Sequence, residues 1–155
     1  MEPMKLRDMR ETDLGAVGAL AEAAGLFPAE ALPEMASEGL GGDAPDIWRV
    51  AETSDAQLAG FSFTRAETFA DGTWNMLALA VGDAFRRKGV AAGLVADLKA
   101  VLALRKGRIL IVDTSSSGDF NAARAFYTAQ GFVTEARIRD YWGPGDDKIT
   151  FWSAL

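Results

Sequence analysis

The chain has 155 residues, the size of one domain with a single sizeable hydrophobic core. It contains no cysteine and no histidine, which excludes disulfides, thiolate zinc sites and the catalytic triads that depend on histidine. Its net charge of -6 argues against a broad nucleic-acid-binding surface, because neutralising many phosphates requires clustered Lys and Arg side chains.

The first third of the chain predicts one strand and two helices. Residues 4–10 alternate loosely between apolar and polar side chains, as a strand does. Thr12 or Asp13 then caps a helix whose apolar residues recur at helical spacing. A second helix is expected to begin near Pro33, which suits a first helical turn, and to end in the glycine-rich stretch 39–42.

The middle third predicts three strands and a helix. Residues 47–53 and 57–69 are rich in β-branched and aromatic side chains, and we expect them to pair as an antiparallel hairpin. Residues 73–81 form the next expected strand. A helix with apolar residues along one face then begins near Val90, and Gly107 terminates it.

The last third predicts a strand, a helix and two final strands. The unbroken apolar run over 109–112 indicates a strand that is buried on both faces at the centre of the sheet. A helix is expected over about 120–130, followed by strands over 133–142 and 148–155. This order of elements predicts an α/β fold in which helices cover a mixed sheet.

A basic segment lies between the strand over 73–81 and the helix that follows it. Arg86, Arg87 and Lys88 place three positive charges there, on a chain that is otherwise acidic. Gly89 lets the backbone approach a ligand closely, and the unpaired N–H groups of a first helical turn favour an anion. The segment therefore indicates a pyrophosphate site, and its alternative is a solvated surface turn. It lacks the spacing of a P-loop or of a dinucleotide-binding motif.

The same segment resembles the GNAT-type N-acetyltransferase superfamily. Its Arg86-x-x-Gly89-x-Ala91 matches the family pattern Gln/Arg-x-x-Gly-x-Gly/Ala. A second family pattern, Ala-x-x-Leu/Phe-Tyr-x-x-x-Gly-Phe/Tyr, is matched after the next strand by Ala123, Phe126, Tyr127, Gly131 and Phe132. The similarity extends from about Trp74 to the C-terminus.

The resemblance implies a central, mostly antiparallel sheet of about seven strands, splayed between strands 4 and 5, with about four helices. It also implies acetyl-coenzyme A as a co-substrate, with its pantetheine arm in the splay and its pyrophosphate at the basic segment. The residues expected to bind it through backbone groups are Leu79, Ala80 and Val81 for the pantetheine, and Arg86, Arg87, Lys88, Gly89, Val90 and Ala91 for the pyrophosphate.

One position departs from the family pattern. Many relatives have an asparagine seven residues before the tyrosine, where it contacts the pantetheine, but Phe120 stands there in this chain. Asn121 follows it, and a shift of one residue on a helix turns a side chain by about 100°. Asn121 is therefore kept as a candidate contact.

Tyr127 falls at the family position of the general acid. A phenol with a pKa near 10 stays protonated at neutral pH and can donate a proton to a departing thiolate. The alternative is that Tyr127 is a tyrosine of the hydrophobic core.

The acceptor amine must also lose a proton. Because histidine is absent, that proton passes to a carboxylate, a water chain or the backbone. Asp113, at the end of the apolar strand, is the first candidate base, although it could instead cap a turn. The other carboxylates near the expected cleft are Glu67, Asp71, Asp140 and Asp147. The absence of cysteine favours direct attack of the amine on the thioester over an acyl-enzyme.

The sequence thus predicts a single-domain N-acetyltransferase over 1–155 that acts on a primary amine of a small molecule or peptide. The alternatives are a noncatalytic acyl-coenzyme A sensor and a structural domain without a ligand. No apolar run approaches the roughly 18 residues that span a bilayer, so we expect a cytoplasmic protein with no membrane partner, no nucleic-acid partner and no metal. The last strand, with Phe151 and Trp152 exposed, could supply a homodimer interface.

Overall fold

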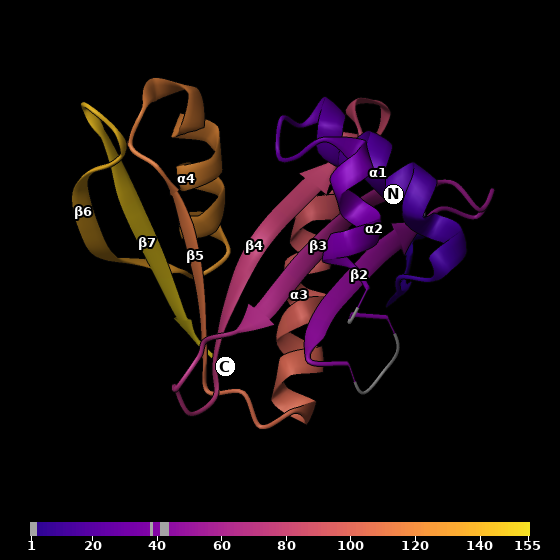
Figure 1. The fold of residues 1–155 in the computed structure, drawn as a ribbon, viewed down its shortest axis with the longest axis horizontal. Helices are drawn as coiled ribbons and strands as arrows, with labels where there is room; N and C mark the ends of the chain where they lie inside the picture. The colour runs from indigo at the N-terminus through magenta and orange to yellow at the C-terminus, as the bar shows by residue number, and fades with distance from the viewer. Residues whose placement is uncertain (1–2, 38, 41–43) are drawn as a thin grey trace.

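A seven-stranded sheet forms the centre of the protein (Figure 1). A computed structural model describes residues 3–37, 39–40 and 44–155. The strands run in the order β1-β2-β3-β4-β5-β7-β6, and each neighbouring pair is antiparallel except β4 and β5. Their bounds are β1 Lys5–Asp8, β2 Asp46–Glu52, β3 Leu58–Ala66, β4 Thr73–Val81, β5 Ile109–Ser115, β6 Val133–Gly143 and β7 Asp146–Ala154.

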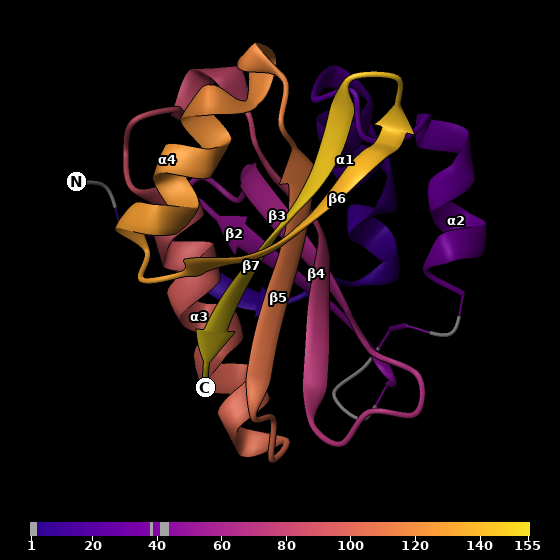
Figure 2. The ribbon, with the colours of Figure 1, turned by 90° about the vertical axis from the view of Figure 1, so that its left-hand side faces the viewer.

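Helices cover both faces of this sheet (Figure 2). The helices α1 (Leu14–Ala23) and α2 (Leu32–Met35) lie on one face, and α3 (Val90–Leu104) and α4 (Asn121–Ala129) lie on the other. Short 3₁₀ helices precede each of these elements: η1 Glu11–Asp13, η2 Ala29–Ala31, η3 Asp83–Phe85 and η4 Gly118–Phe120.

The apolar spacing of the sequence explains why α3 forms and which side it buries. Its buried side chains recur three or four residues apart, and they are Val90, Leu94, Val95, Leu98 and Leu102. Burial of each such side chain contributes about 1.5–3 kcal/mol before entropy is counted. On the opposite face, α1 and α2 pack over Trp48, whose ring stacks on Phe63 at 3.9 Å between centroids.

The strands β4 and β5 lie side by side only at one end. Three residue pairs join them, from Thr73 opposite Ile109 to Asn75 opposite Ile111. Beyond that point both strands continue without pairing to each other, and Figure 1 shows them diverging. A bulge in β4 lies just past the last pair, because Met76 and Ala78 face consecutive residues of β3 and Leu77 falls between them. The splay expected between strands 4 and 5 is confirmed.

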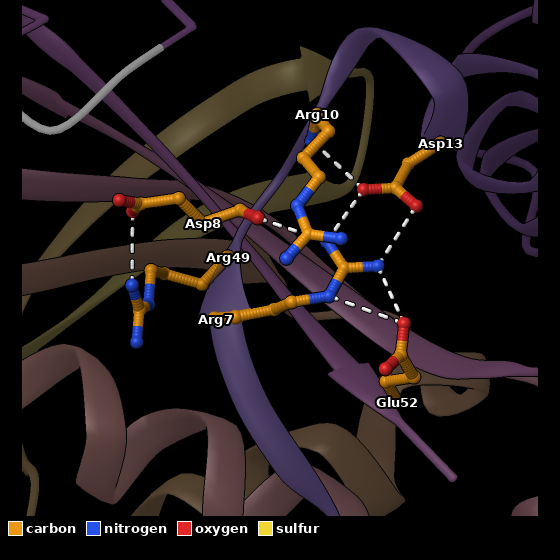
Figure 3. Close-up of polar contacts among 6 residues, drawn as sticks. All are labelled: Arg7, Asp8, Arg10, Asp13, Arg49 and Glu52. Carbon is orange, nitrogen blue, oxygen red and sulfur yellow. Dashed lines mark hydrogen bonds and ion pairs between the residues drawn. The ribbon is translucent and has the colours of Figure 1, made fainter. Parts of the chain in front are cut away.

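A charged network ties β1 to the elements around it (Figure 3). The Arg7 guanidinium group donates hydrogen bonds of 2.7 and 3.0 Å to Asp13 and of 2.7 and 3.2 Å to Glu52. The Arg10 backbone amide donates to the same Asp13 carboxylate at 2.8 Å. Because the Arg7 and Asp13 side chains are about nine-tenths buried, this network fixes η1 against β1 and β2.

The second helix is shorter than the sequence predicts. It ends at Met35, so the end expected within 39–42 is wrong, although Gly41 and Gly42 themselves lie outside the described residues. The amides of Ser37 and Gly39 donate to the carbonyl groups three residues back, so the chain forms turns there instead of continuing the helix, and the backbone at Gly39 packs against the Trp48 indole ring.

Two expectations about burial are also wrong. On β5, Leu110 is buried but Ile109 and Ile111 are only partly buried, because α1 and α2 cover β2, β3 and β4 on that face and do not extend over β5. On β7, an inner strand between β5 and β6, Phe151 is buried with 2% exposure and cannot form a surface, because its ring packs against Tyr127 in the α3–α4 core. The strand at that edge of the sheet is β6.

Candidate active site

The end of β4 and the start of α3 form a turn with exposed backbone amides. Gly89 stands at the N-cap of α3 with φ of +79°, a left-handed conformation that favours glycine. In the described part of the chain, Gly93 is the first residue of α3 whose amide has a backbone acceptor, the Gly89 carbonyl oxygen at 2.9 Å. The preceding amides of Val90, Ala91 and Ala92 therefore remain available to an anion.

The three cations of this turn differ in their surroundings. Arg86 Nε donates a 2.8 Å hydrogen bond to Asp83 Oδ1, and both side chains are exposed. Arg87 and Lys88 are exposed, and no ion pair to either is found among the described residues. Arg86 is therefore partly neutralised by an acidic neighbour that the sequence interpretation overlooked, although Asp83 stands only three residues before it.

Tyr127 lies on α4 and points into the core between α4 and the sheet. Its ring contacts those of Phe126, Phe132 and Phe151 at centroid distances of 5.4 to 5.7 Å. Burial raises the pKa of its phenol from 10.0 to about 12. Leu79 lies on the part of β4 that is paired with β3 but not with β5, and it packs against the same apolar cluster as Tyr127. Tyr127 thus belongs to the core, as the alternative supposed, and lies beside the β4 segment expected to bind the pantetheine.

A polar cluster crosses the sheet where the splay begins. Asn75 Nδ2 donates to Glu67 Oε1 at 2.9 Å and lies 3.4 Å from Asp113 Oδ2. Asp113 Oδ1 accepts a 2.6 Å hydrogen bond from the Thr150 hydroxyl group, and Lys148 Nζ lies 4.0 Å from Asp113 Oδ2. Val112, the residue before Asp113, packs in the α3–α4 core with Tyr127. Because successive side chains of a strand point to opposite faces, Asp113 lies on the other face of the sheet.

Of the predicted carboxylates, Glu67 and Asp113 both contact Asn75, whereas the other three lie elsewhere. Asp140 and Asp147 lie on the β6–β7 hairpin, where the Asp140 backbone amide donates to Asp147 at 2.9 Å. This bond and the Arg137 side chain lower the pKa of Asp147. Asp71 lies in the turn between β3 and β4.

Sequence analysis missed the members of the cluster that join its carboxylates. Asn75 could have been recognised from the sequence, because it is a polar residue inside the apolar strand TWNMLALAV. No sequence pattern identifies Thr150 and Lys148, because their proximity to Asp113 depends on the register between β5 and β7.

Asn121 is the first residue of α4, and its side chain is engaged within the protein. Its Oδ1 accepts a short hydrogen bond from Arg124, which also donates to the backbone carbonyl groups of Ser115 and Ser117. Arg124 thus joins the start of α4 to the end of β5. Phe120, which precedes Asn121, is 44% exposed.

Among the residues that the structure describes, no three His, Cys, Asp or Glu side chains gather as metal ligands. Within the same residues, no helix has the length and apolarity required to cross a membrane.

Comparison with known proteins identifies the fold around this site. A family model described as an acetyltransferase (GNAT) domain matches residues 45–134, more than half of the chain. The chain belongs to the GNAT acetyltransferase family. This membership confirms the family and the acyltransferase class that the sequence motifs indicated. A search among curated proteins found no match for this GNAT protein.

Solved structures of GNAT proteins share the whole fold. A GNAT-family protein from Desulfovibrio desulfuricans is 26% identical, with a TM-score of 0.89 over 98% of this chain and 99% of that one. An aminoglycoside 6'-N-acetyltransferase in complex with coenzyme A is 14% identical, with a TM-score of 0.82 over 97% of each chain. The ribosomal-protein-S18-alanine N-acetyltransferase from Escherichia coli is 21% identical, with a TM-score of 0.78 over 99% of this chain and 94% of that one. The last two support the fold alone.

Proposed function

We propose that this GNAT protein transfers the acetyl group of acetyl-coenzyme A to a primary amine. One observation carries the proposal: β4 parts from β5 after Asn75, and its free edge is flanked by the Tyr127 cluster on one face of the sheet and by Asp113 on the other. A thioester held between these groups has an acid on one side and a base on the other.

The residues at the end of β4 fit the pantetheine arm of the co-substrate. Leu79, Ala80 and Val81 pair with β3 through one edge of the strand, and their other edge is not paired with β5. Backbone groups along that edge can bind the amides of the arm as a neighbouring strand would. The free amides of Val90, Ala91 and Ala92 at the start of α3, together with the exposed Arg87 and Lys88 side chains, favour this turn as the pyrophosphate site. Asn121 can contribute only if its bond to Arg124 breaks.

The proposed reaction is a direct transfer in a ternary complex. The amine nitrogen forms a bond to the acetyl carbon, and the bond from that carbon to sulfur breaks. Asp113 accepts the proton that the nitrogen loses, directly or through a water molecule. Tyr127 donates its proton to the departing sulfur, and the raised pKa of its phenol keeps that proton in place at neutral pH.

Two measurements test the proposal together. Acetyl-coenzyme A should raise the Tm of the protein, because it binds the folded state alone. An assay of free thiol should then show turnover when amines are added, with polyamines, amino acids, aminoglycosides and peptides as the panel. A raised Tm without turnover by any amine would favour the noncatalytic acyl-coenzyme A sensor. No shift in Tm at saturating co-substrate would reject both functions.

A further inference from the structure

A groove of about 360 Å³ opens on the α1–α2 face of the sheet. Its volume falls within the range of small-molecule sites. Its lining is mostly apolar, and the residues that form it are Leu26, Phe27, Met35, Phe63, Leu77 and Ala78, together with Arg65. Leu26 and Leu77 are 42% and 49% exposed, so the groove presents apolar surface to water. Phe27 is held edge-on against Phe61 at 6.4 Å, which keeps that wall in place.

The groove adjoins the proposed thioester position through β4. Leu77, the bulged residue, and Ala78 line the groove and immediately precede the Leu79 backbone. Ala78 packs with the α1–α2 core, whereas Leu79 packs with the cluster of Tyr127. A molecule in the groove therefore approaches the opening between β4 and β5 from the side opposite the proposed acid.

The charged groups around the groove indicate which end of a bound molecule would lie inside it. Arg65 is the one charged side chain among the described residues that line it, and its guanidinium group pairs with Asp46 at 2.9 Å. A second ammonium group in this groove would lose water, and no carboxylate among the described lining residues would replace that water, because the Asp46 carboxylate is already paired with Arg65. The carboxylates of Glu67 and Asp113 lie instead at Asn75, two residues along β4 from Leu77. The Asn75 Oδ1 atom is buried and has no partner in the described part of the chain, so this cluster has a spare hydrogen-bond acceptor.

We propose, on the basis of the function proposed above, that the acceptor is a primary amine carried by an uncharged apolar group. The amino group lies toward the Glu67–Asn75–Asp113 cluster, and the apolar group fills the groove beside Leu77. Polyamines and aminoglycosides, which carry further ammonium groups, are poor acceptors.

A matched pair of amines tests this preference. Hexylamine and 1,6-diaminohexane have the same chain length and differ by one terminal amino group. Wild-type protein should acetylate hexylamine with a kcat/KM at least about tenfold higher, because the second ammonium group loses hydration in the groove. The Leu77→Asp variant should raise the KM for hexylamine, leave the KM for acetyl-coenzyme A unchanged and narrow the ratio between the two amines. Leu104→Asp, at an 88% exposed leucine on α3, is the matched control and should leave the ratio unchanged.

Binding without turnover separates this inference from the proposed function. The Kd of hexylamine is measured by calorimetry in the presence of coenzyme A. If hexylamine binds and the Leu77→Asp substitution weakens this binding, the groove is supported. If at the same time no amine is acetylated, the proposed function alone fails. Equal or better turnover of 1,6-diaminohexane by the wild-type protein overturns the inference and leaves the function standing. If hexylamine neither binds nor reacts, the inference is likewise overturned.

Discussion

The Thr150 hydroxyl group donates a hydrogen bond of 2.6 Å to Asp113 Oδ1, from β7 to β5. This bond holds the carboxylate with its second oxygen toward Asn75 and Lys148. Thr150 and Asp113 are directly opposite each other in the strand register, so the sheet itself sets this contact. The carboxylate is therefore positioned before any substrate arrives.

Replacing Asp113 by Asn should lower kcat/KM by about 100-fold at neutral pH, because the side chain keeps its shape but no longer accepts a proton. Initial rates against pH provide the measurement. The variant should recover activity at alkaline pH, where more of the amine is already deprotonated. Asp119→Asn, at an exposed carboxylate of η4, serves as the control. An unchanged rate in Asp113→Asn would assign the proton to water or to another group.

Replacing Tyr127 by Phe should reduce kcat by about 100-fold while the Kd of acetyl-coenzyme A stays the same. The phenyl ring preserves the contacts with Phe126, Phe132 and Phe151, so the core remains packed. Calorimetry and steady-state kinetics separate the two quantities. The chain has two tyrosines, and Tyr141→Phe, on the exposed hairpin, is the matched control. Equal turnover in the Tyr127→Phe protein would remove the phenol from the chemistry.

Local patterns in the sequence were sufficient for much of the fold. The strand predicted over 73–81 has those bounds in the structure, and the helix expected from Val90 begins there. Both elements are decided by apolar periodicity and by glycine at their ends, which act over a few residues. The splay of β4 from β5 came from the family resemblance, because no local pattern encodes where two strands part.

Contacts between distant segments could not be predicted from one sequence. Asn75, Asp113 and Thr150 meet only because of the strand order and register, and the sequence separations are 38 and 37 residues. The packing of Gly39, beyond the early end of α2, against Trp48 of β2 is likewise a contact between separate elements. The burial of Phe151 depends on its contact with Tyr127 of α4. The roles assigned to Tyr127 and Asp113 remain predictions.

Replacing Gly89 by Val should abolish the rise in Tm caused by acetyl-coenzyme A. A β-branched residue at φ of +79° is strained by about 1–2 kcal/mol, so the turn that presents the α3 amides should change conformation. Gly25→Val is the control, because Gly25 has a φ of +71° at the end of α1 and a Cβ there meets no atom within 4 Å. Both variants should lose stability, but only Gly89→Val should lose the response. A full response in Gly89→Val would exclude this turn from co-substrate binding.

Replacing Asp13 by Asn should destabilise the protein by about 3 kcal/mol near neutral pH, because Arg7 loses a buried charged partner. The hydrogen bond from Arg7 lowers the pKa of Asp13 in the folded state. In the unfolded chain the pKa of Asp13 is about 3.9, so its ionised carboxylate stabilises the fold fully above that pH. This contribution is lost as the pH falls through the lower pKa of the folded state. The difference between wild type and variant should therefore shrink on acidification. Urea unfolding across the acidic range measures it, with the exposed Asp55→Asn as control. A difference that stays constant with pH would show that the Asp13 charge does not contribute.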